Sequence, residues 1–215
     1  MSRQPDLFAA AAHEPAAAPG LTILRGYALP LEQPLLQAIA AVAAAAPFRH
    51  MITPGGQRMS AALTNCGEVG WVSDRAGYRY ARCDPQTGLP WPALPECIAQ
   101  LGQHAAAQCG FAAFRPEVCL INRYAPGARM SLHQDRDERD LSAPIVSISL
   151  GLEAIFLFGG LRRCERAHRV PLSHGDVAVW GGAQRLAYHG VAALAEGIHP
   201  NLGRMRLNLT LRRAL

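Results

Sequence analysis

The sequence contains two short histidine–aspartate pairs that could each supply two ligands to a metal ion. His133-Gln-Asp135 and His174-Gly-Asp176 each place an imidazole and a carboxylate two positions apart, and in an extended segment such residues project to the same side. Two histidines and one carboxylate on one face hold Fe(II) in non-haem oxygenases and leave positions open for O2 and a cosubstrate. With 8 histidines and 16 acidic residues in the chain, chance supplies about 0.6 such pairs. At least one of the two is therefore expected to be a decoy.

The local sequence favours the first pair. His174-Gly175-Asp176 resembles a turn before the apolar run Val177–Trp180, and there Asp176 would serve the turn through backbone hydrogen bonds. His133 and Asp135 instead follow a Pro-Gly turn and open into a polar run, as expected of a loop at the rim of a site.

The third ligand would be a distant histidine. His189 lies between Tyr188 and Gly190, 17 residues before Arg206, whereas His199 is followed by Pro and Asn in an expected loop. The pattern favours His189, and the alternative is that these histidines are structural and satisfied by hydrogen bonds.

The segment Arg204–Arg212 has the strongest local pattern. Its leucines alternate with polar residues, so that Arg206, Asn208, Thr210 and Arg212 share one face of a strand. An ordinary half-buried strand with a solvated polar face explains this pattern. Alternatively, arginines six residues and roughly 20 Å apart, each reaching inward, leave about 6–8 Å for a short dicarboxylate. The planar guanidinium suits a carboxylate bidentately, as an ammonium does not.

Composition excludes several classes of protein. All 21 basic residues are arginine, which excludes lysine Schiff-base enzymes and the lysine-dependent P-loop. The six cysteines never form a C-x-x-C pair, which argues against a zinc ribbon and for reduced thiols. The net charge of +5 agrees with binding to a phosphate backbone.

The elements expected to position these residues are two helices and many short strands. Helical spacing follows Pro34 up to Ala46 and follows Pro95 up to Cys109, before Gly110. Turn signals separate the strands, which are predicted at 21–27, 58–64, 118–124, 145–150, 154–158, 177–180 and 204–212. We predict an α+β fold with a double-stranded β-helix (jelly-roll) core and N-terminal helices packed on one sheet.

Residues 1–20 are predicted to be a flexible N-terminal tail, and 21–215 a single domain. No apolar run is long enough to cross a membrane, and the first residues lack a signal peptide's apolar stretch. We expect a cytoplasmic monomer with no membrane partner.

Taken together, the chain resembles the AlkB family of Fe(II)- and 2-oxoglutarate-dependent nucleic-acid dealkylases, from about Leu21 to Arg212. The resemblance is carried, in order, by TPGG (53–56), TNCG (64–67), DPQTGLPWPALP (84–95), CLINRYAPGA (119–128), SLHQD (131–135), APIVSISLGL (143–152), IFLFGGL (155–161), HGDVAVWGG (174–182), YHG (188–190) and RLNLTLR (206–212). It favours His133, Asp135 and His189 as the iron ligands. It also implies a nucleotide-recognition lid within residues 45–90.

The resemblance further implies the cosubstrates and their contacts. O2 and 2-oxoglutarate would react at Fe(II), with the oxygens of 2-oxoglutarate held by Asn122, Tyr124, Arg206, Asn208 and Arg212. The expected products are succinate, CO2, formaldehyde and a demethylated base.

The implied substrate is alkylated DNA, single-stranded as well as duplex, carrying lesions of the 1-methyladenine and 3-methylcytosine type. Such a base is cationic and pairs badly, so extruding it into a pocket costs less than extruding a normal base. By resemblance, Trp71 stacks on the base, Tyr78 and Tyr80 belong to the lid, Asp137 contacts the exocyclic amine and Arg163 lies near the substrate. Without the resemblance, Trp71 could be a packed lid residue and the charge run at 135–140 a solvated face.

The chain departs from the family at three positions. Gln57 and Ala187 stand where the family carries aromatic residues, and Met130 replaces a leucine. Two other functions remain open: the same chemistry on RNA, a protein or a small molecule, and a non-catalytic module that binds lesions.

Overall fold

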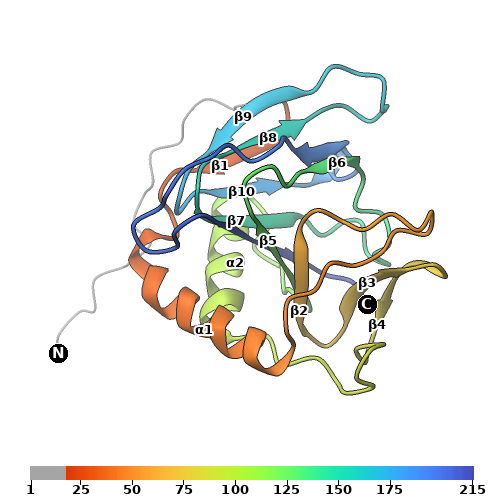
Figure 1. Ribbon diagram of the computed structural model, residues 1–215. Helices are drawn as coiled ribbons and strands as arrows, with labels where there is room; N and C mark the ends of the chain where they lie inside the picture. Colours follow the sequence, from red (N-terminus) through yellow and green to blue (C-terminus); the bar gives the residue numbers. More distant parts are fainter. Residues whose placement is uncertain (1–17) are drawn as a thin grey trace.

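The fold is two facing β-sheets with two helices on the outer side of the larger one. The computed structural model describes residues 18–215, so most of the predicted tail at 1–20 lies outside the described residues. One sheet has six strands in the order β1-β10-β7-β12-β5-β2, and the other has four in the order β6-β11-β8-β9. The predicted jelly-roll core is confirmed (Figure 1).

The elements run in chain order as follows: β1 (Leu21–Leu24), η1 (Leu29–Leu31), α1 (Glu32–Ala45), β2 (Ala62–Gly67), β3 (Gly70–Asp74), β4 (Gly77–Ala81), α2 (Glu96–Gln108), β5 (Val118–Tyr124), β6 (Met130–His133), β7 (Ile145–Gly151), β8 (Ala154–Phe158), β9 (His168–Leu172), β10 (Val177–Trp180), η2 (Gly182–Gln184), β11 (His189–Val191) and β12 (Arg206–Arg212).

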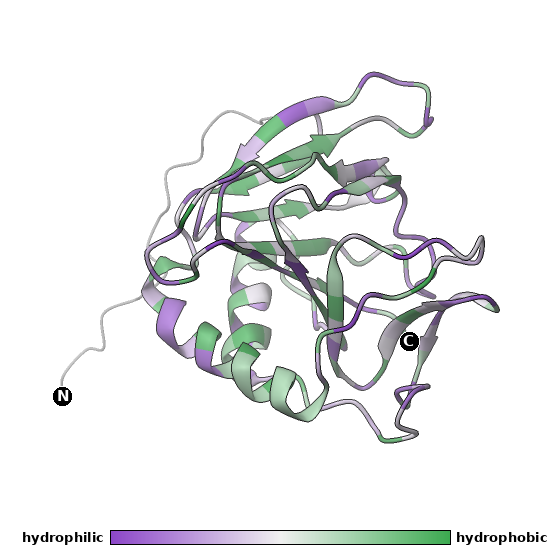
Figure 2. Cartoon of the chain, viewed as in Figure 1, coloured by the Kyte–Doolittle hydropathy of each residue, from purple (hydrophilic) through white to green (hydrophobic). Residues whose placement is uncertain are grey.

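The two predicted helices are confirmed. In α1, Leu35, Ile39 and Val42 are buried at helical spacing, and α2 buries Ile98 and Leu101 in the same way. Both helices share one apolar cluster with alternate residues of β5, β7, β10 and β12. Hydrophobic residues accordingly concentrate on the helices and strands, and polar ones in many of the loops (Figure 2). The helices therefore close the outer face of the larger sheet and leave its inner face to the site.

Strand β12 lies at the centre of the larger sheet, hydrogen-bonded to β5 and β7. All seven of its residues are buried. Its leucines pack toward the helices, so its polar side chains face the smaller sheet, as alternation requires. The interpretation of β12 as a strand with a solvated polar face is therefore wrong. Buried polar groups need partners, and those partners define the interior of the site.

A separate two-stranded sheet, β3 and β4, lies within the segment predicted to hold the lid. Trp71 pairs with Tyr80, and Ser73 with Tyr78, across this hairpin. It lies below the level of β6 in the view of Figure 1, beside β2, which β3 contacts. Trp71 and Tyr78 are stacked, with ring centroids 5.5 Å apart.

The cysteines are all free thiols in this structure, as predicted. Among the described residues, no helix is long and apolar enough to span a membrane.

Candidate metal centre and cosubstrate pocket

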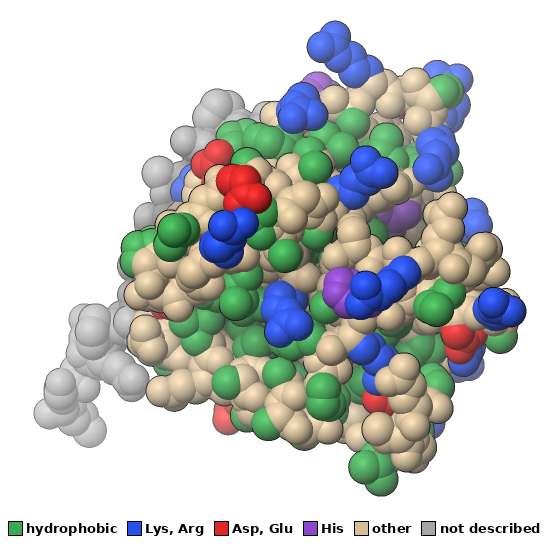
Figure 3. All heavy atoms as spheres, viewed as in Figure 1, with side chains coloured by type: hydrophobic (Ala, Val, Ile, Leu, Met, Phe, Trp, Pro, Cys, Tyr) green, Lys and Arg blue, Asp and Glu red, His purple; other side chains and the backbone are tan. Residues whose placement is uncertain are grey.

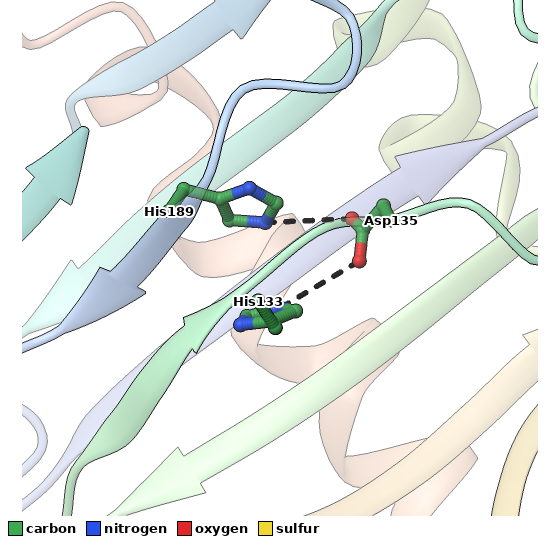
Figure 4. Close-up of side chains that lie close together, drawn as sticks. All are labelled: His133, Asp135 and His189. Carbon is green, nitrogen blue, oxygen red and sulfur yellow. Dashed lines mark ion pairs between the residues drawn. The ribbon is translucent and has the colours of Figure 1, made fainter. Parts of the chain in front are cut away.

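Three side chains from two neighbouring strands and the loop after one of them form a compact group. His133 ends β6 and lies directly opposite His189 in β11, while Asp135 follows β6 by two residues. Nε2 of His133 lies 3.6 Å from Oδ1 of Asp135, and Nε2 of His189 lies 3.6 Å from Oδ2 (Figure 4). One ligand atom from each residue lies within 4.8 Å of the others. A single divalent ion fits this donor set.

The backbone fixes which nitrogen each histidine offers. Nδ1 of His133 lies 2.9 Å from the carbonyl oxygen of Ser131, and Nδ1 of His189 lies 3.0 Å from that of Ala187. A carbonyl accepts only from a protonated nitrogen, so Nδ1 carries the hydrogen and Nε2 keeps its lone pair toward the centre. This arrangement is the outer-shell support found around metal-binding imidazoles.

The charges of the group suit a cation. Burial, together with the neighbouring His189, lowers the pKa of His133 to about 4. Burial alone would raise the pKa of the Asp135 carboxyl, but Arg212 and the two histidines hold it well below its usual value. Metal ligands must be deprotonated, and at neutral pH His133 and Asp135 already are.

The second histidine–aspartate pair has a structural role. Oδ2 of Asp176 accepts a hydrogen bond from the backbone N–H of Ser173, and Oδ1 accepts from that of Gly26. Nδ1 of His174 accepts from the backbone N–H of Gly151. The prediction that Asp176 serves a turn is confirmed.

A cavity of about 660 Å³ opens beside the histidine–aspartate group and runs between the sheets to the β3–β4 hairpin. It is lined by all three members of the group, by four of the residues expected at 2-oxoglutarate (Asn122, Tyr124, Asn208 and Arg212) and by four of those expected at the base (Trp71, Tyr78, Asp137 and Arg163). Gln57 and Met130, two of the departures from the family, also line it.

Two predicted site residues stand outside the cavity lining. The Arg206 guanidinium is buried behind the ring of Tyr124, with Cζ 5.3 Å from the ring centroid. The Tyr80 hydroxyl points into the protein and donates a 2.6 Å hydrogen bond to Oε1 of Glu138. Ala187, the third departure, is fully buried.

The residues expected to bind 2-oxoglutarate differ in whether their polar atoms already have hydrogen-bond partners within the protein. Nδ2 of Asn208 already donates to Oγ of Ser147 and to the carbonyl oxygen of Ile148. By contrast, Oδ1 of Asn122 and both Nε and Nη1 of Arg206 are buried without a hydrogen-bond partner among residues 18–215. Buried polar atoms without partners are rare in proteins. A carboxylate beside Arg206 would supply the acceptors it lacks.

Two further buried residues, which the sequence did not indicate, lie next to the candidate metal ligand Asp135 and Arg212. Glu138 lies within the charge run at 135–140, for which a solvated face was the alternative interpretation, and Arg185 lies just after η2; both are buried. Arg185 donates to the carbonyl oxygens of Asp135 and Ala143. No local pattern marks either position, because their partners lie more than 40 residues away in the chain.

Comparison with known proteins agrees with this geometry. The family model for the 2OG-Fe(II) oxygenase superfamily matches residues 20–212. The alpha-ketoglutarate-dependent dioxygenase AlkB of Salmonella typhimurium is 56% identical over 97% of each chain. A DNA N(6)-methyladenine demethylase, ALKBH1D of Arabidopsis thaliana, is 42% identical over 45% of this chain and 24% of its own. The solved structure of OsALKBH1 superposes with a TM-score of 0.78 at 27% identity, covering 91% of this chain and 98% of the other.

The expectation of an Fe(II)- and 2-oxoglutarate-dependent dioxygenase, with O2 as the second cosubstrate, is confirmed by these matches. Because the match runs along nearly the whole chain and includes the segments that carry His133, Asp135 and His189, the protein belongs to the AlkB family of 2OG-Fe(II) oxygenases.

Proposed function

We propose that this protein oxidatively demethylates N-alkylated bases in DNA and so repairs them by direct reversal. The observation that carries the proposal is that one continuous cavity is lined both by the histidine–aspartate group and by the stacked rings of Trp71 and Tyr78. A base held at the hairpin would therefore present its methyl group toward the metal.

The metal would be held by His133, Asp135 and His189. Fe(II) in such a site supplies activation of O2, with 2-oxoglutarate as the electron donor. In the balanced reaction one oxygen atom of O2 enters succinate, as CO2 leaves, and the other enters the N-methyl group. The bond between the ring nitrogen and the hydroxymethyl carbon then breaks, its electron pair stays on the ring nitrogen, and formaldehyde and the hydroxyl proton are released.

The cosubstrate would lie along the inner face of β12. Two nitrogens of Arg206, Nε and Nη1, are buried without a hydrogen-bond partner in the described part of the chain. Burial raises the pKa of Tyr124, so its hydroxyl stays a donor. Arg212 lies at the other end of the strand, beside Asp135. The two arginines would take opposite carboxylates, with Asn122 and Asn208 along the path between them.

The base would enter between the hairpin and the loop after β6. Trp71 and Tyr78 provide flat rings, and a cationic base is attracted to their faces. Nε1 of Trp71 donates a 2.9 Å hydrogen bond to Oδ2 of Asp137, which leaves Oδ1 as an acceptor for an exocyclic amine. Arg163 lies over the ring of Tyr188, 5.9 Å from its centroid, at the opposite wall.

Arginines at the cavity mouth would hold the phosphates on either side of the extruded base. Arg58, Arg129, Arg136 and Arg163 all line the cavity, and arginine side chains surround a hollow on the face shown in Figure 3. The net charge of +5 adds a long-range attraction that weakens with salt. We propose that the protein acts as a monomer of one domain, residues 21–215, on single-stranded as well as duplex DNA.

The test is mass spectrometry of an oligonucleotide containing 1-methyladenine, incubated with protein, Fe(II), 2-oxoglutarate and ascorbate in air. Loss of the methyl group that requires both iron and 2-oxoglutarate is the expected result. A competition between this oligonucleotide and an RNA strand of the same sequence carrying the same methylated base decides whether DNA or RNA is the preferred substrate. If the methyl group stays on both strands while succinate accumulates, the substrate is wrong and the proposal fails.

A further inference from the structure

Around the proposed metal ligand Asp135 lies a buried cluster of charged residues, and two of its members, Glu138 and Arg185, have no role in the chemistry described so far. Asp135 and Glu138 are buried, whereas Arg136 and Asp137 between them are exposed. Two guanidinium groups, those of Arg185 and Arg212, meet these two carboxylates in the interior. The cluster is therefore electrically balanced before any ligand binds.

Glu138 is the centre of this cluster. Its Oε1 accepts the 2.6 Å hydrogen bond from the Tyr80 hydroxyl and lies 3.4 Å from Nε of Arg212. Its Oε2 lies 3.2 Å from Nη2 of Arg185. Only 1% of its side chain is exposed. A carboxylate so deeply buried is costly unless its partners compensate it, so its contacts define a fixed position.

Arg212 is shared between two carboxylates. Its Nε and Nη2 each lie 2.7 Å from Oδ2 of Asp135, while the Nε edge also faces Glu138. Nη1 points toward the Tyr80 oxygen at 3.5 Å. The planar fork is thus held on one edge by acidic groups, and its orientation is set by Glu138 and Tyr80 as well as by the metal ligand.

We infer that Glu138 is a positioning residue, which holds the Arg212 guanidinium in the orientation that receives a carboxylate of 2-oxoglutarate. The inference rests on the proposed role of Arg212 in cosubstrate binding. Without Glu138, the Nε edge loses the carboxylate that lies 3.4 Å from it, the Tyr80 hydroxyl loses its acceptor, and the fork is less constrained in its orientation. Bidentate recognition depends on that orientation, so the cosubstrate would be bound less well.

Replacing Glu138 by a neutral residue changes both the charge of the cluster and the orientation of Arg212, and the two changes have opposite expected effects on the affinity for 2-oxoglutarate. Removing the carboxylate with Glu138→Gln leaves one more positive charge in the buried cluster. If only charge mattered, the dianionic cosubstrate would bind more tightly. If orientation matters, it binds more weakly even though the site has become more positive.

The experiment is calorimetric titration of 2-oxoglutarate into the full-length protein loaded with Mn(II), without nucleic acid or turnover. We expect Glu138→Gln to weaken 2-oxoglutarate binding about tenfold, the size expected when one charge-assisted hydrogen bond is lost. Tyr80→Phe retains the charge and removes one contact, so it should weaken binding about two- to threefold. Glu196→Gln, at an exposed pair with Arg204, makes the same chemical change at the surface and serves as the control.

Steady-state kinetics then separate positioning from general damage. The KM for 2-oxoglutarate should rise in both variants, and by a larger factor than the KM for the methylated oligonucleotide. If Glu138→Gln fails to fold, Tyr80→Phe still tests the inference. Tighter or unchanged 2-oxoglutarate binding in the folded variants overturns it. The calorimetric result does not depend on the nucleic-acid substrate, so it stands apart from a failure of the proposed function.

Discussion

His133 and His189 lie directly opposite each other in the antiparallel pair of β6 and β11, with ring centroids 4.4 Å apart. Although 56 positions separate them in the sequence, the pairing of the two strands places them side by side. Side chains of directly paired residues project to the same face. This pairing, rather than the two-residue spacing of His133 and Asp135 alone, is what makes three ligands converge.

The first prediction concerns the pH dependence of stability in the metal-free protein. Burial and His189 lower the pKa of His133 to about 4, against about 6.5 in an unfolded chain. The unfolded state therefore takes up a proton as the pH falls below 6.5, while the folded state does not. We expect the free energy of unfolding to decrease from pH 6.5 toward pH 4, and to decrease less in His133→Gln.

Denaturant titrations at a series of pH values check this prediction. Since 39% of the His133 side chain is exposed, solvent reduces its contribution to the pH dependence of stability. The test is therefore the difference between the pH profiles of the parent and of His133→Gln. Parallel pH profiles for the two proteins would contradict the prediction.

A second prediction concerns the shape of the cation at Arg212. Arg212→Lys keeps the charge but replaces a planar fork by a single ammonium group, which cannot bind a carboxylate bidentately. The KM for 2-oxoglutarate should rise at least about tenfold, with a much smaller change in the KM for the oligonucleotide. Unchanged 2-oxoglutarate affinity would remove Arg212 from the site.

A third prediction concerns the unpartnered N–H groups of Arg206. Among residues 18–215 only Nη2 of this buried guanidinium has an acceptor, Oγ of Ser149. Buried N–H groups without acceptors are unfavourable, and an apolar side chain of similar length relieves that cost. Arg206→Met should therefore have a Tm no lower than that of the parent without ligand. With Mn(II) present, 2-oxoglutarate should raise the Tm of the parent and not that of the variant. An equal rise in both proteins would show that the cosubstrate does not need Arg206.

A fourth prediction concerns the phosphate backbone. If Arg163 contacts a phosphate, Arg163→Gln should weaken binding of any oligonucleotide sequence and reduce the slope of log affinity against log salt by about one. Arg204→Gln, a change of the same kind at a residue outside the cavity lining, should leave the slope unaltered. Fluorescence anisotropy at several salt concentrations measures both. An unchanged slope for Arg163→Gln places its contact elsewhere.

Periodicity predicted the parts of the fold that are long and regular. The buried faces of α1 and α2 follow the helical spacing, and the alternation of β12 predicted which side chains share a face. Among the strands that escaped prediction are β6, β9 and β11. β11 has three residues, β6 has four, and β9 contains Pro171, so each is too short or too irregular to carry a periodic signal.

Some residues of the site could also be predicted from the sequence, and others could not. The spacing of His133 and Asp135 marked a candidate, and the turn-like surroundings of the second histidine–aspartate pair favoured the first. The resemblance then chose the first pair. Glu138 could not be found from the sequence. Its neighbours Arg136 and Asp137 are exposed, and its burial depends on Tyr80, Arg185 and Arg212 from distant elements.

The stoichiometry of the reaction shows whether removal of the methyl group is coupled to decarboxylation of 2-oxoglutarate. Succinate, formaldehyde and demethylated base should form in equal amounts when the parent protein acts on a 1-methyladenine oligonucleotide with Fe(II), 2-oxoglutarate and O2. Asp135→Ala, verified to be folded, should form none of the three. Full activity in that variant with its iron content confirmed, or demethylation by the parent without succinate, would contradict the account.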